Sequence, residues 1–555
     1  MLLTTIPYLL GFANQGDAWR FTGFVFGVED GNSYIAKMLS GAEGAWLFRT
    51  PYTAVFQRGV LAFLPYILLG KLTAGPGQHE QLVALFHLYR FVAGVLAILA
   101  MYDFISYFVL RVRLRRLGAA LAAFGGGLGW VLILLGRENW LGSLPLDFYS
   151  PETFGFLSLY GLPHLAIARA LLLRGLLAYL RNAEGRSGQY NDRGTKSGLL
   201  WLLMGLFQPL TVIVAWAVVG AHLAGLALFG NGVPDKEYRS RAVRRGLVAG
   251  LVSSPIVLYT LWAFTTDPFL RVWTDQNLIL SPHPLHYLVA YGLVLPFAVR
   301  GARRLLRQNP ARGWLPVAWA AIMPALAYAP HNLQRRLPEG VWVALVILAL
   351  KAEPGANQPA QRPRLPRSGR MRFHTLGVFF FLFVSTLLLL AGGVMGVADP
   401  KEPVFRPVEE IAAFQLLREQ AEPGDVVLAS FETGNALPAW APVRVVIGHG
   451  PESVRLDELR LRVAAFYQPD TDDCLQSLDA DRKALLDEFD VRYVFWGRAE
   501  RNLGSWDPRE APYLRVVKSD GLDAIFEVPK KGGGGAAAAT PFFRASSLTC
   551  FVRTP

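Results

Sequence analysis

Long apolar runs joined by basic loops restrict what this sequence can fold into. A transmembrane helix needs about 20 consecutive, mostly apolar residues, and several runs approach or exceed that length. Hydrophobic residues make up 52% of the chain, and the formal net charge is +13. Basic charge could indicate nucleic-acid binding, but here Lys and Arg stand between the apolar runs, as in the cytoplasmic loops of membrane proteins. The sequence therefore predicts a polytopic α-helical membrane protein with no nucleic-acid partner.

The lengths of the apolar runs and the charges of the loops together predict roughly ten spans. The opening MLLTTIPYLLGF lacks the basic start and cleavage site of a signal peptide, and we interpret it as the outer end of a first helix whose start is missing. Residues 13–80 follow as a long first outer loop. The apolar segments expected after it are 82–110, 117–136, 160–180, a hairpin over 198–230 broken at Gln208-Pro209, 247–264, 284–300, 314–329, 339–351 and 374–397.

The first outer loop is expected to contain interfacial helices. Residues 33–42 have a helical pattern. Residues 53–72 are apolar enough for a span, but they include charged residues and a proline. Counting them as a span would also place the basic run RVRLRR on the outer side, against the charge rule. We therefore predict that 53–72 is a helix lying on the outer membrane surface.

Charge rises and the apolar runs shorten from about residue 399. PVEEIAAFQLLREQ predicts an amphipathic helix, and DVVLAS, VRVVIG and VRYVFWG predict buried strands. Helices are expected at 454–468 and 474–489, and YLRVVKS with AIFEV could form a final hairpin. This alternation predicts an extracytoplasmic α/β domain over 399–530, after a transmembrane domain over 1–398. The remainder, 531–555, has the composition of a low-complexity, disordered tail. The cysteines, Cys474 and Cys550, are too few for a disulfide framework.

Asp30, next to Glu29 in the first outer loop, is the candidate catalytic base. Charge near hydrocarbon is costly and is usually kept for function. An inverting glycosyl transfer needs a carboxylate that takes the proton from the attacking hydroxyl. The alternative is structural: EDGNSY precedes a helical segment, and Asp is a common N-cap residue.

Arg335 and Arg336, in the outer sequence HNLQRRLPEG, are candidates for binding a lipid phosphate. Paired guanidinium groups can hold a phosphate through bidentate hydrogen bonds and stabilise it as a leaving group. His331 and Gln334 are near enough in sequence to contribute. The alternative is anchoring at the membrane interface by snorkelling, although positive charge on the outer side is disfavoured.

Asp147, Glu152 and His164 form a third group, in LPLDFYSPETFGFLSLYGLPH. They could bind an acceptor hydroxyl, a phosphate or a metal, although each alone also suits a solvated loop or a helix cap. No HExxH, DxD or Cys/His cluster predicts a metal site, so a divalent cation remains open. Walker A and Rossmann motifs are absent, which argues against a nucleotide-driven pump and a nucleotide-sugar domain.

Four further polar residues carry weaker expectations. Asp267 and Asp275 could contact an acceptor, and His449 and Glu500 could have structural or acceptor-side roles.

In the order of these features, the chain resembles the GT-C superfamily of polyprenyl-phosphate-sugar glycosyltransferases. The stretch FTGFVFGVEDGNSYIAKMLSGAEGAWLFRTPYT is similar to uncharacterised bacterial members. So are HNLQRRLPEG, ETGNALPAWAPVRVVIGHGPES and VRYVFWGRAER. The resemblance implies inverting transfer of a hexose or pentose from a polyprenyl-phosphate donor to a glycan, lipid or protein acceptor, at the extracytoplasmic face of the bacterial plasma membrane. It also implies that Asp30 is the base and that Arg335 and Arg336 bind phosphate.

Other functions remain open from the sequence. A flippase for a lipid-linked sugar should show repeated halves with matching broken helices, and no clear repeat is visible. A surface-polysaccharide polymerase or ligase would use outer arginines but needs no Asp in the first loop. An inactive scaffold has no need for Asp30 together with Arg335 and Arg336.

Overall fold

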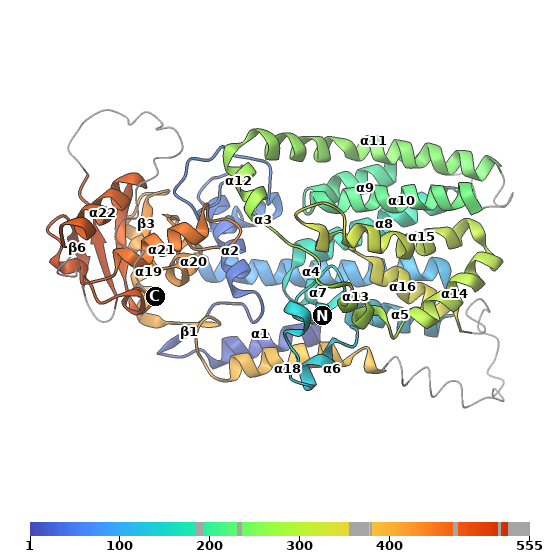
Figure 1. Ribbon diagram of the computed structural model, residues 1–555, viewed down its shortest axis with the longest axis horizontal. Coiled ribbons are helices and arrows are strands. Elements are labelled where there is room, and N and C mark those ends of the chain that lie inside the picture. Colours follow the sequence, from blue (N-terminus) through green and yellow to red (C-terminus); the bar gives the residue numbers. More distant parts are fainter. Residues whose placement is uncertain are drawn as a thin grey trace.

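The computed structural model describes residues 1–183, 192–229, 236–353, 377, 380–469, 475–519 and 523–530 of the 555-residue chain. Helices run along the longest axis of the molecule, and a small sheet with its own helices lies at one end (Figure 1). The predicted tail 531–555, both cysteines and most of the basic loop 351–373 lie outside the described residues.

Four of the helices described are long and apolar enough to cross a membrane, as an integral membrane protein requires. They are α4 (Gln78–Phe108), α8 (Pro163–Ala183), α10 (Pro209–Phe229) and α11 (Lys236–Thr266). A fifth span is counted if α13 (Pro284–Tyr291) and α14 (Leu295–Gln308) act together, although they bend by 73°. These numbers confirm a helical membrane body but not the predicted ten spans.

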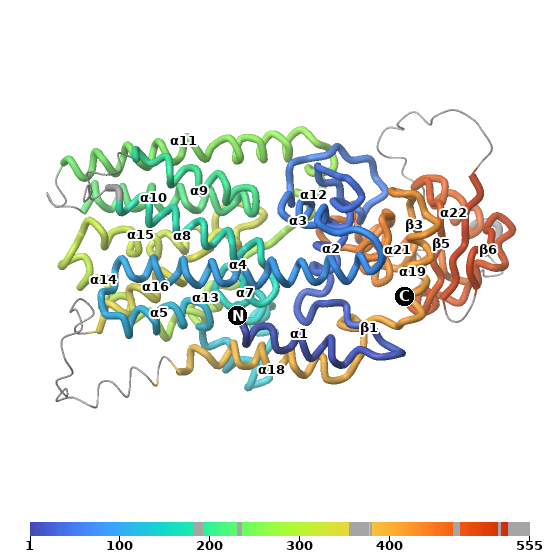
Figure 2. Tube along the Cα trace, turned by 180° about the vertical axis from the view of Figure 1, so that it is seen from behind, coloured from blue at the N-terminus to red at the C-terminus, as the bar shows by residue number. Residues whose placement is uncertain are grey.

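Shorter helices fill the rest of the helical body. They are α1 (Leu2–Asn14), α7 (Phe156–Gly161), α15 (Pro310–Ala327), the fully buried α16 (Val341–Lys351) and α18 (Val384–Ala398). The first and last of these, α1 and α18, run side by side along one edge, as both views show (Figures 1 and 2).

Two of the predicted apolar segments are broken by their own residues. The predicted break at Gln208-Pro209 is confirmed, because α9 (Thr195–Gly205) ends shortly before it and α10 begins at Pro209. The single span predicted over 117–136 is wrong. It is divided into α5 (Val112–Phe124) and α6 (Gly129–Leu134) by a run of glycines. The backbone of this run bonds to other elements, including Gly126 N–H to the Leu382 carbonyl at 2.6 Å.

The first long loop differs from its prediction. Helix α2 (Val28–Ala42) includes the predicted helix 33–42 but begins five residues earlier. The single helix predicted over 53–72 is wrong, because only α3 (Leu64–Gly70) is helical there. The Gln57 side chain instead closes a tight loop, accepting from Thr50 N–H at 2.8 Å and donating to the Thr50 carbonyl at 2.9 Å. Short α3 then packs directly on α2.

The carboxyl-terminal part has the predicted α/β character. Its sheet has five strands in the order β4-β3-β5-β7-β6, in which β3, β4 and β5 are parallel and β7 and β6 add an antiparallel hairpin. The strands are β3 (Val426–Leu428), β4 (Arg444–Val445), β5 (Val491–Trp496), β6 (Arg515–Lys518) and β7 (Ala524–Glu527). The helices are α19 (Val408–Gln420), α20 (Phe431–Ala436), α21 (Leu456–Phe466), α22 (Leu475–Glu488) and α23 (Arg498–Leu503).

The first long loop and the segment after α18 meet beside this sheet. Strand β1 (Trp19–Phe21), in the first loop, pairs antiparallel with β2 (Phe405–Pro407), which leads into α19. One hydrophobic core then combines α2 and α4 with the sheet, including Tyr34, Phe86 and Phe495. The loop that carries Asp30 is thereby held between the helical body and the sheet.

Candidate functional site

Asp30 lies in the first turn of α2, but it does not cap the helix. The N-cap position is Gly27, whose φ of 58° is the left-handed conformation that glycine adopts without strain. No side chain caps this end, and the Asp30 side chain is 54% exposed. The N-cap alternative for Asp30 is therefore wrong. Its carboxylate is free to face a ligand near the positive end of the helix dipole.

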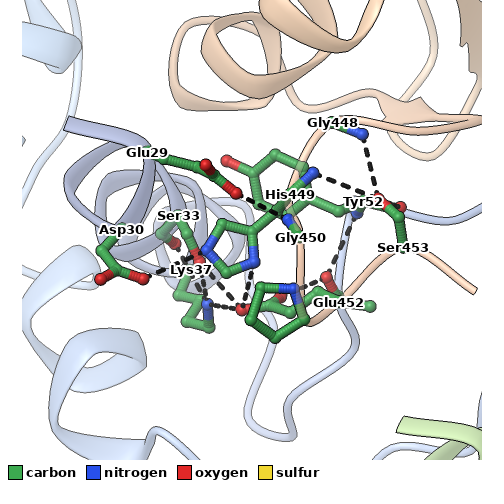
Figure 3. A network of polar contacts seen from close by, with 12 residues as sticks. Glu29, Asp30, Ser33, Lys37, Tyr52, Gly448, His449, Gly450, Glu452 and Ser453 are labelled. Atoms are coloured by element: carbon green, nitrogen blue, oxygen red, sulfur yellow. Dashed lines mark hydrogen bonds and ion pairs between the residues drawn. The ribbon is translucent and has the colours of Figure 1, made fainter. Parts of the chain in front are cut away.

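His449 is the residue that contacts Asp30 (Figure 3). It belongs to the loop Gly448–Ser453 that follows β4, and its Nε2 donates to Asp30 Oδ1 at 3.3 Å. Although about half of the Asp30 side chain is exposed, the surrounding protein displaces water from it, and this desolvation by itself would raise the pKa of Asp30. The hydrogen bond and charge of His449, with the charges of Arg336 and Lys37, outweigh burial and lower it. Asp30 is thus ionised at neutral pH, as a general base must be.

Glu29 attaches α2 to the same loop. Its Oε1 accepts a hydrogen bond from Gly450 N–H at 2.6 Å, while Asn435 Nδ2 from α20 donates to the Glu29 backbone carbonyl at 3.3 Å. The structure therefore separates the two adjacent carboxylates: Glu29 binds the loop, and Asp30 is left partly open.

A buried network lies one and two helical turns beyond Asp30. Lys37 Nζ forms an ion pair with Glu452 Oε1 at 2.6 Å, and both side chains are almost fully buried. Ser33 Oγ donates to the same carboxylate at 2.9 Å, and the Thr50 hydroxyl also donates to it. These partners supply the hydrogen bonds that a buried charge requires.

The sequence alone did not indicate this network. Its signal was the spacing of Asp30, Ser33 and Lys37, which places them along one face of a helix. Their partner Glu452, more than 400 residues later, had no such signal.

Arg336 lies close enough to Asp30 for its charge to lower the pKa of that carboxyl. It lies in the 3-10 turn η3 (Gln334–Arg336), and its Nε is 3.6 Å from Oε1 of the buried Glu152. The pKa of Tyr34 lies well above its usual value, because the hydroxyl is buried and because of the charge of Asp30. The charge of Arg336 opposes that rise. The charges of Asp30, Arg336 and Glu152 therefore all act on the Tyr34 hydroxyl.

Arg335 has a different environment from Arg336. Its guanidinium stacks on the Tyr149 ring, 4.4 Å from the ring centre. Its Nε is buried and has no hydrogen-bond partner among the described residues.

His331 and Gln334 contribute to the turn itself. His331 Nδ1 accepts from Leu333 N–H at 3.0 Å, and the Gln334 amide can bond to Ala329 and Ser281.

The third predicted group is divided between two places. His164 Nδ1 lies 2.9 Å from the Tyr66 hydroxyl, and Tyr66 stacks on Tyr34, so His164 lies behind the site. Asp147 is instead buried against the glycine turn before α6, where it accepts from Gly127 N–H and from Ser385 Oγ. These contacts give Asp147 a structural role between α6 and α18.

An ion pair that the sequence analysis missed holds the loop of Glu152. Arg169 of α8 pairs with Glu339 at 2.5 Å and donates to the Pro151 and Phe154 carbonyls. Both side chains of the pair are buried. Since Glu339 lies three residues after Arg336, one ion pair fixes both segments that carry Glu152 and Arg336.

Two of the four weaker candidates, Asp267 and Glu500, have structural contacts. Asp267 caps α12 (Pro268–Gln276) by accepting from Leu270 N–H at 3.0 Å. Glu500 is fully buried and accepts from Ser430 N–H and Gly497 N–H. Within the described part of the chain, no group of three or more His, Cys, Asp or Glu side chains could hold a metal ion.

Comparison with known proteins gives structural neighbours only. No family model and no curated protein matches the sequence. Arabinofuranosyltransferase AftD from Mycobacteria has a TM-score of 0.51 at 15% identity, covering 96% of this chain and 40% of AftD. A mutant of AftD has a TM-score of 0.53 over the same share of this chain. This chain thus spans about two fifths of the length of AftD.

A further structural neighbour is an archaeal enzyme. The oligosaccharyltransferase from Archaeoglobus fulgidus, tethered to an acceptor peptide, has a TM-score of 0.46 at 13% identity, covering 89% of this chain and 68% of that one. Both neighbours are GT-C superfamily members. At these identities the similarity concerns the fold alone. The statement about the fold rests on AftD, which has the higher TM-score. The chain has the GT-C fold.

Proposed function

We propose that this chain is an inverting glycosyltransferase that uses a polyprenyl-phosphate sugar as donor and an acceptor hydroxyl on the extracytoplasmic side of a bacterial plasma membrane. The observation that carries this proposal is the environment of Asp30. Its carboxylate is ionised and half-exposed, and the cationic Arg336 lies close enough for its charge to lower the pKa of Asp30. A base with a nearby cation that can bind a phosphate suits this transfer.

Each of these residues has one step in the proposed reaction. The hydroxyl oxygen of the acceptor attacks the anomeric carbon while its proton passes to Asp30. The bond from that carbon to the phosphate oxygen breaks, and its electron pair stays on the departing lipid phosphate. Arg336 stabilises the growing negative charge of that phosphate, and the pairing with Glu152 orients its guanidinium. Asp30 finally releases its proton to water.

The remaining expectations belong to the same proposal. Arg335, His331 and Gln334 would line the donor phosphate region. The carboxyl-terminal unit 399–530 would lie on the extracytoplasmic side with the catalytic centre, after a membrane domain over 1–398. Of the described polar residues, Asp30 and Arg336 carry the chemistry, and a divalent cation is tested by adding a chelator to the assay.

A reconstituted transfer assay tests the proposal. Wild type, Asp30→Asn and the matched control Asp17→Asn are placed in liposomes with a panel of polyprenyl-phosphate sugars and a membrane extract as acceptor. Asp17 is exposed in the same loop. We expect transfer by wild type and control, and a loss of at least about 100-fold in Asp30→Asn with donor binding retained.

The alternatives predict other results in this assay. Equal transfer by wild type and Asp30→Asn would show that the base is another residue. Movement of the donor across the bilayer without transfer would support a lipid-linked sugar flippase instead.

A further inference from the structure

We propose that His449 is a positioning residue for Asp30, so that a loop of the carboxyl-terminal sheet completes the catalytic centre. This inference rests on the proposed function. The residue that positions Asp30 would then come from the sheet and not from the helical body. The contact is direct: His449 Nε2 donates to Asp30 Oδ1 at 3.3 Å across 419 residues of sequence (Figure 3).

The loop that carries His449 is fixed from within. Ser453 Oγ accepts from Gly448 N–H at 3.0 Å and from His449 N–H at 3.1 Å, and it donates to the Tyr52 carbonyl at 3.0 Å. Gly448 also lies so close to Gly434 that a Cβ at either position would meet the backbone of the other segment. The backbone of His449 therefore has little freedom to move away from Asp30.

The same loop is attached to both of its neighbours. On one side, Glu29 of α2 accepts from Gly450 N–H. On the other, Gln276 Nε2 at the end of α12 donates to the Pro451 carbonyl at 3.3 Å and to the Ser453 carbonyl at 2.7 Å. These contacts hold the loop against the first long loop and against the helix that follows α11.

The His449 ring lies between two carboxylates. Its Nε2 faces Asp30, and its Nδ1 lies 3.7 Å from Oε1 of the buried Glu452, which is itself fixed by Lys37. The side chain of His449 is 5% exposed, and its ring contacts that of Tyr52 with centres 5.3 Å apart. Nδ1 itself makes no hydrogen bond among the described residues, so the ring is directed by its Nε2 contact with Asp30, by burial and by packing on Tyr52.

In this arrangement the two carboxylate oxygens of Asp30 have different roles. Oδ1 accepts the hydrogen bond from His449, which leaves Oδ2 as the oxygen that takes the acceptor proton. In Figure 3 one Asp30 carboxylate oxygen faces His449, and the other lies on the side away from the Lys37–Glu452 ion pair. His449 would therefore fix the carboxylate without blocking it.

The charged groups that face Asp30 come from several elements. They are His449 from the sheet loop, Arg336 from η3 and Lys37 from α2 itself, with His164 of α8 and Tyr34 within electrostatic reach. Burial alone would raise the pKa of Asp30, and the hydrogen bond from His449 is the largest of the effects that lower it. Removing that donor should therefore raise the pKa at which the base is lost.

The test compares pH–rate profiles of the full-length protein in membranes. In His449→Ala we expect kcat to fall roughly 10- to 100-fold with the donor KM unchanged. The acidic limb of kcat/KM should move to higher pH. In His449→Gln the side-chain amide can still donate near the position of Nε2, so this variant should recover part of kcat and shift the limb less. The control is His283→Ala, which removes an exposed histidine at the start of α13.

Two results would overturn the inference. One is an unchanged pH limb and kcat in both His449 variants. The other is a loss of activity with an unchanged limb and no recovery by Gln, which would mean that His449 only stabilises the sheet loop. Thermal unfolding midpoints of both variants show whether the loop remains docked. Failure of the proposed function is distinguishable, because Asp30→Asn would then retain transfer.

Discussion

At the residue scale, the site separates its charges by environment. Asp30 and Glu29 are adjacent, yet one is half-exposed beside His449 and the other binds a backbone N–H. Arg335 and Arg336 are adjacent as well, but only Arg336 is paired with Glu152 and acts on Asp30. Residues that are adjacent in sequence therefore have different roles in this site.

That difference predicts unequal effects of two matched substitutions. Arg336→Gln removes the cation next to Asp30, so we expect transfer to fall at least about 100-fold, as for other groups that stabilise developing charge. Arg335→Gln removes a stacking contact with Tyr149 and should lower transfer less than about 10-fold. Initial rates over a donor titration measure both. Equal losses in the two variants would contradict the assignment of Arg336.

The sequence indicated some of the site residues but not others. Asp30, Arg336 and Glu152 stood out because charged groups in outer loops of an apolar chain are unusual. His449 followed a predicted strand with no sign of its target, because its distance to Asp30 depends on how the sheet docks. The structural role of Asp147 was also hidden, since its partners Gly127 and Ser385 come from separate elements.

At the scale of elements, the position of α2 determines where Asp30 lies. Helix α3 crosses α2 so closely that a Cβ on Gly41 would meet the Ile67 carbonyl, and one on Gly70 would meet the Met38 carbonyl. Glycine at both positions permits this backbone approach. The prediction of a surface helix over 53–72 was wrong for this reason. Packing on α2 and the Gln57 hydrogen bonds determine the path of this segment, and hydrophobic periodicity does not encode either of them.

This crossing gives a prediction about stability. Gly41→Ala should force α3 away from α2 and reduce the free energy of unfolding by about 1–3 kcal/mol. Thermal unfolding in detergent measures the effect. Gly250→Ala in α11 is the matched control, because no atom lies within 4 Å of its Cβ position and alanine favours a helix. Unfolding midpoints that agree for the two variants would show that α2 and α3 pack less closely.

At the scale of the whole molecule, the first loop and the last unit of the chain form one assembly. Strands β1 and β2 pair across it, and a shared core and the Gly448–Ser453 loop join the same parts. The sequence predicted the α/β fold of the carboxyl-terminal part, because its strands and helices alternate locally. It could not predict the pairing of residues 19–21 with 405–407, since such long-range contacts have no periodic signal.

The stability of this assembly should depend on pH through Glu410. Burial raises the pKa of this carboxyl to about 7, although Arg406 opposes the shift. Because the folded pKa exceeds the usual 4.5, the protonated group stabilises the fold below pH 4.5. This contribution is lost as the pH rises through 7, and it amounts to at most about 3 kcal/mol.

Glu410→Gln should therefore flatten the fall in thermal midpoint between pH 4.5 and 7. The control Glu419→Gln changes an exposed position on the same helix, α19, and should keep the wild-type slope. If the Glu410→Gln profile runs parallel to that of wild type, the protonation of Glu410 does not control this stability.

The anomeric configuration of the transferred sugar tests the central claim most directly. One base at Asp30 and one displacement at the anomeric carbon predict that the product has the configuration opposite to that of the donor, with the bond formed by wild type and not by Asp30→Asn. Magnetic resonance of the isolated product reads this directly. A product that retains the donor configuration would require two displacements through a covalent sugar–enzyme intermediate, and it would contradict the role assigned to Asp30.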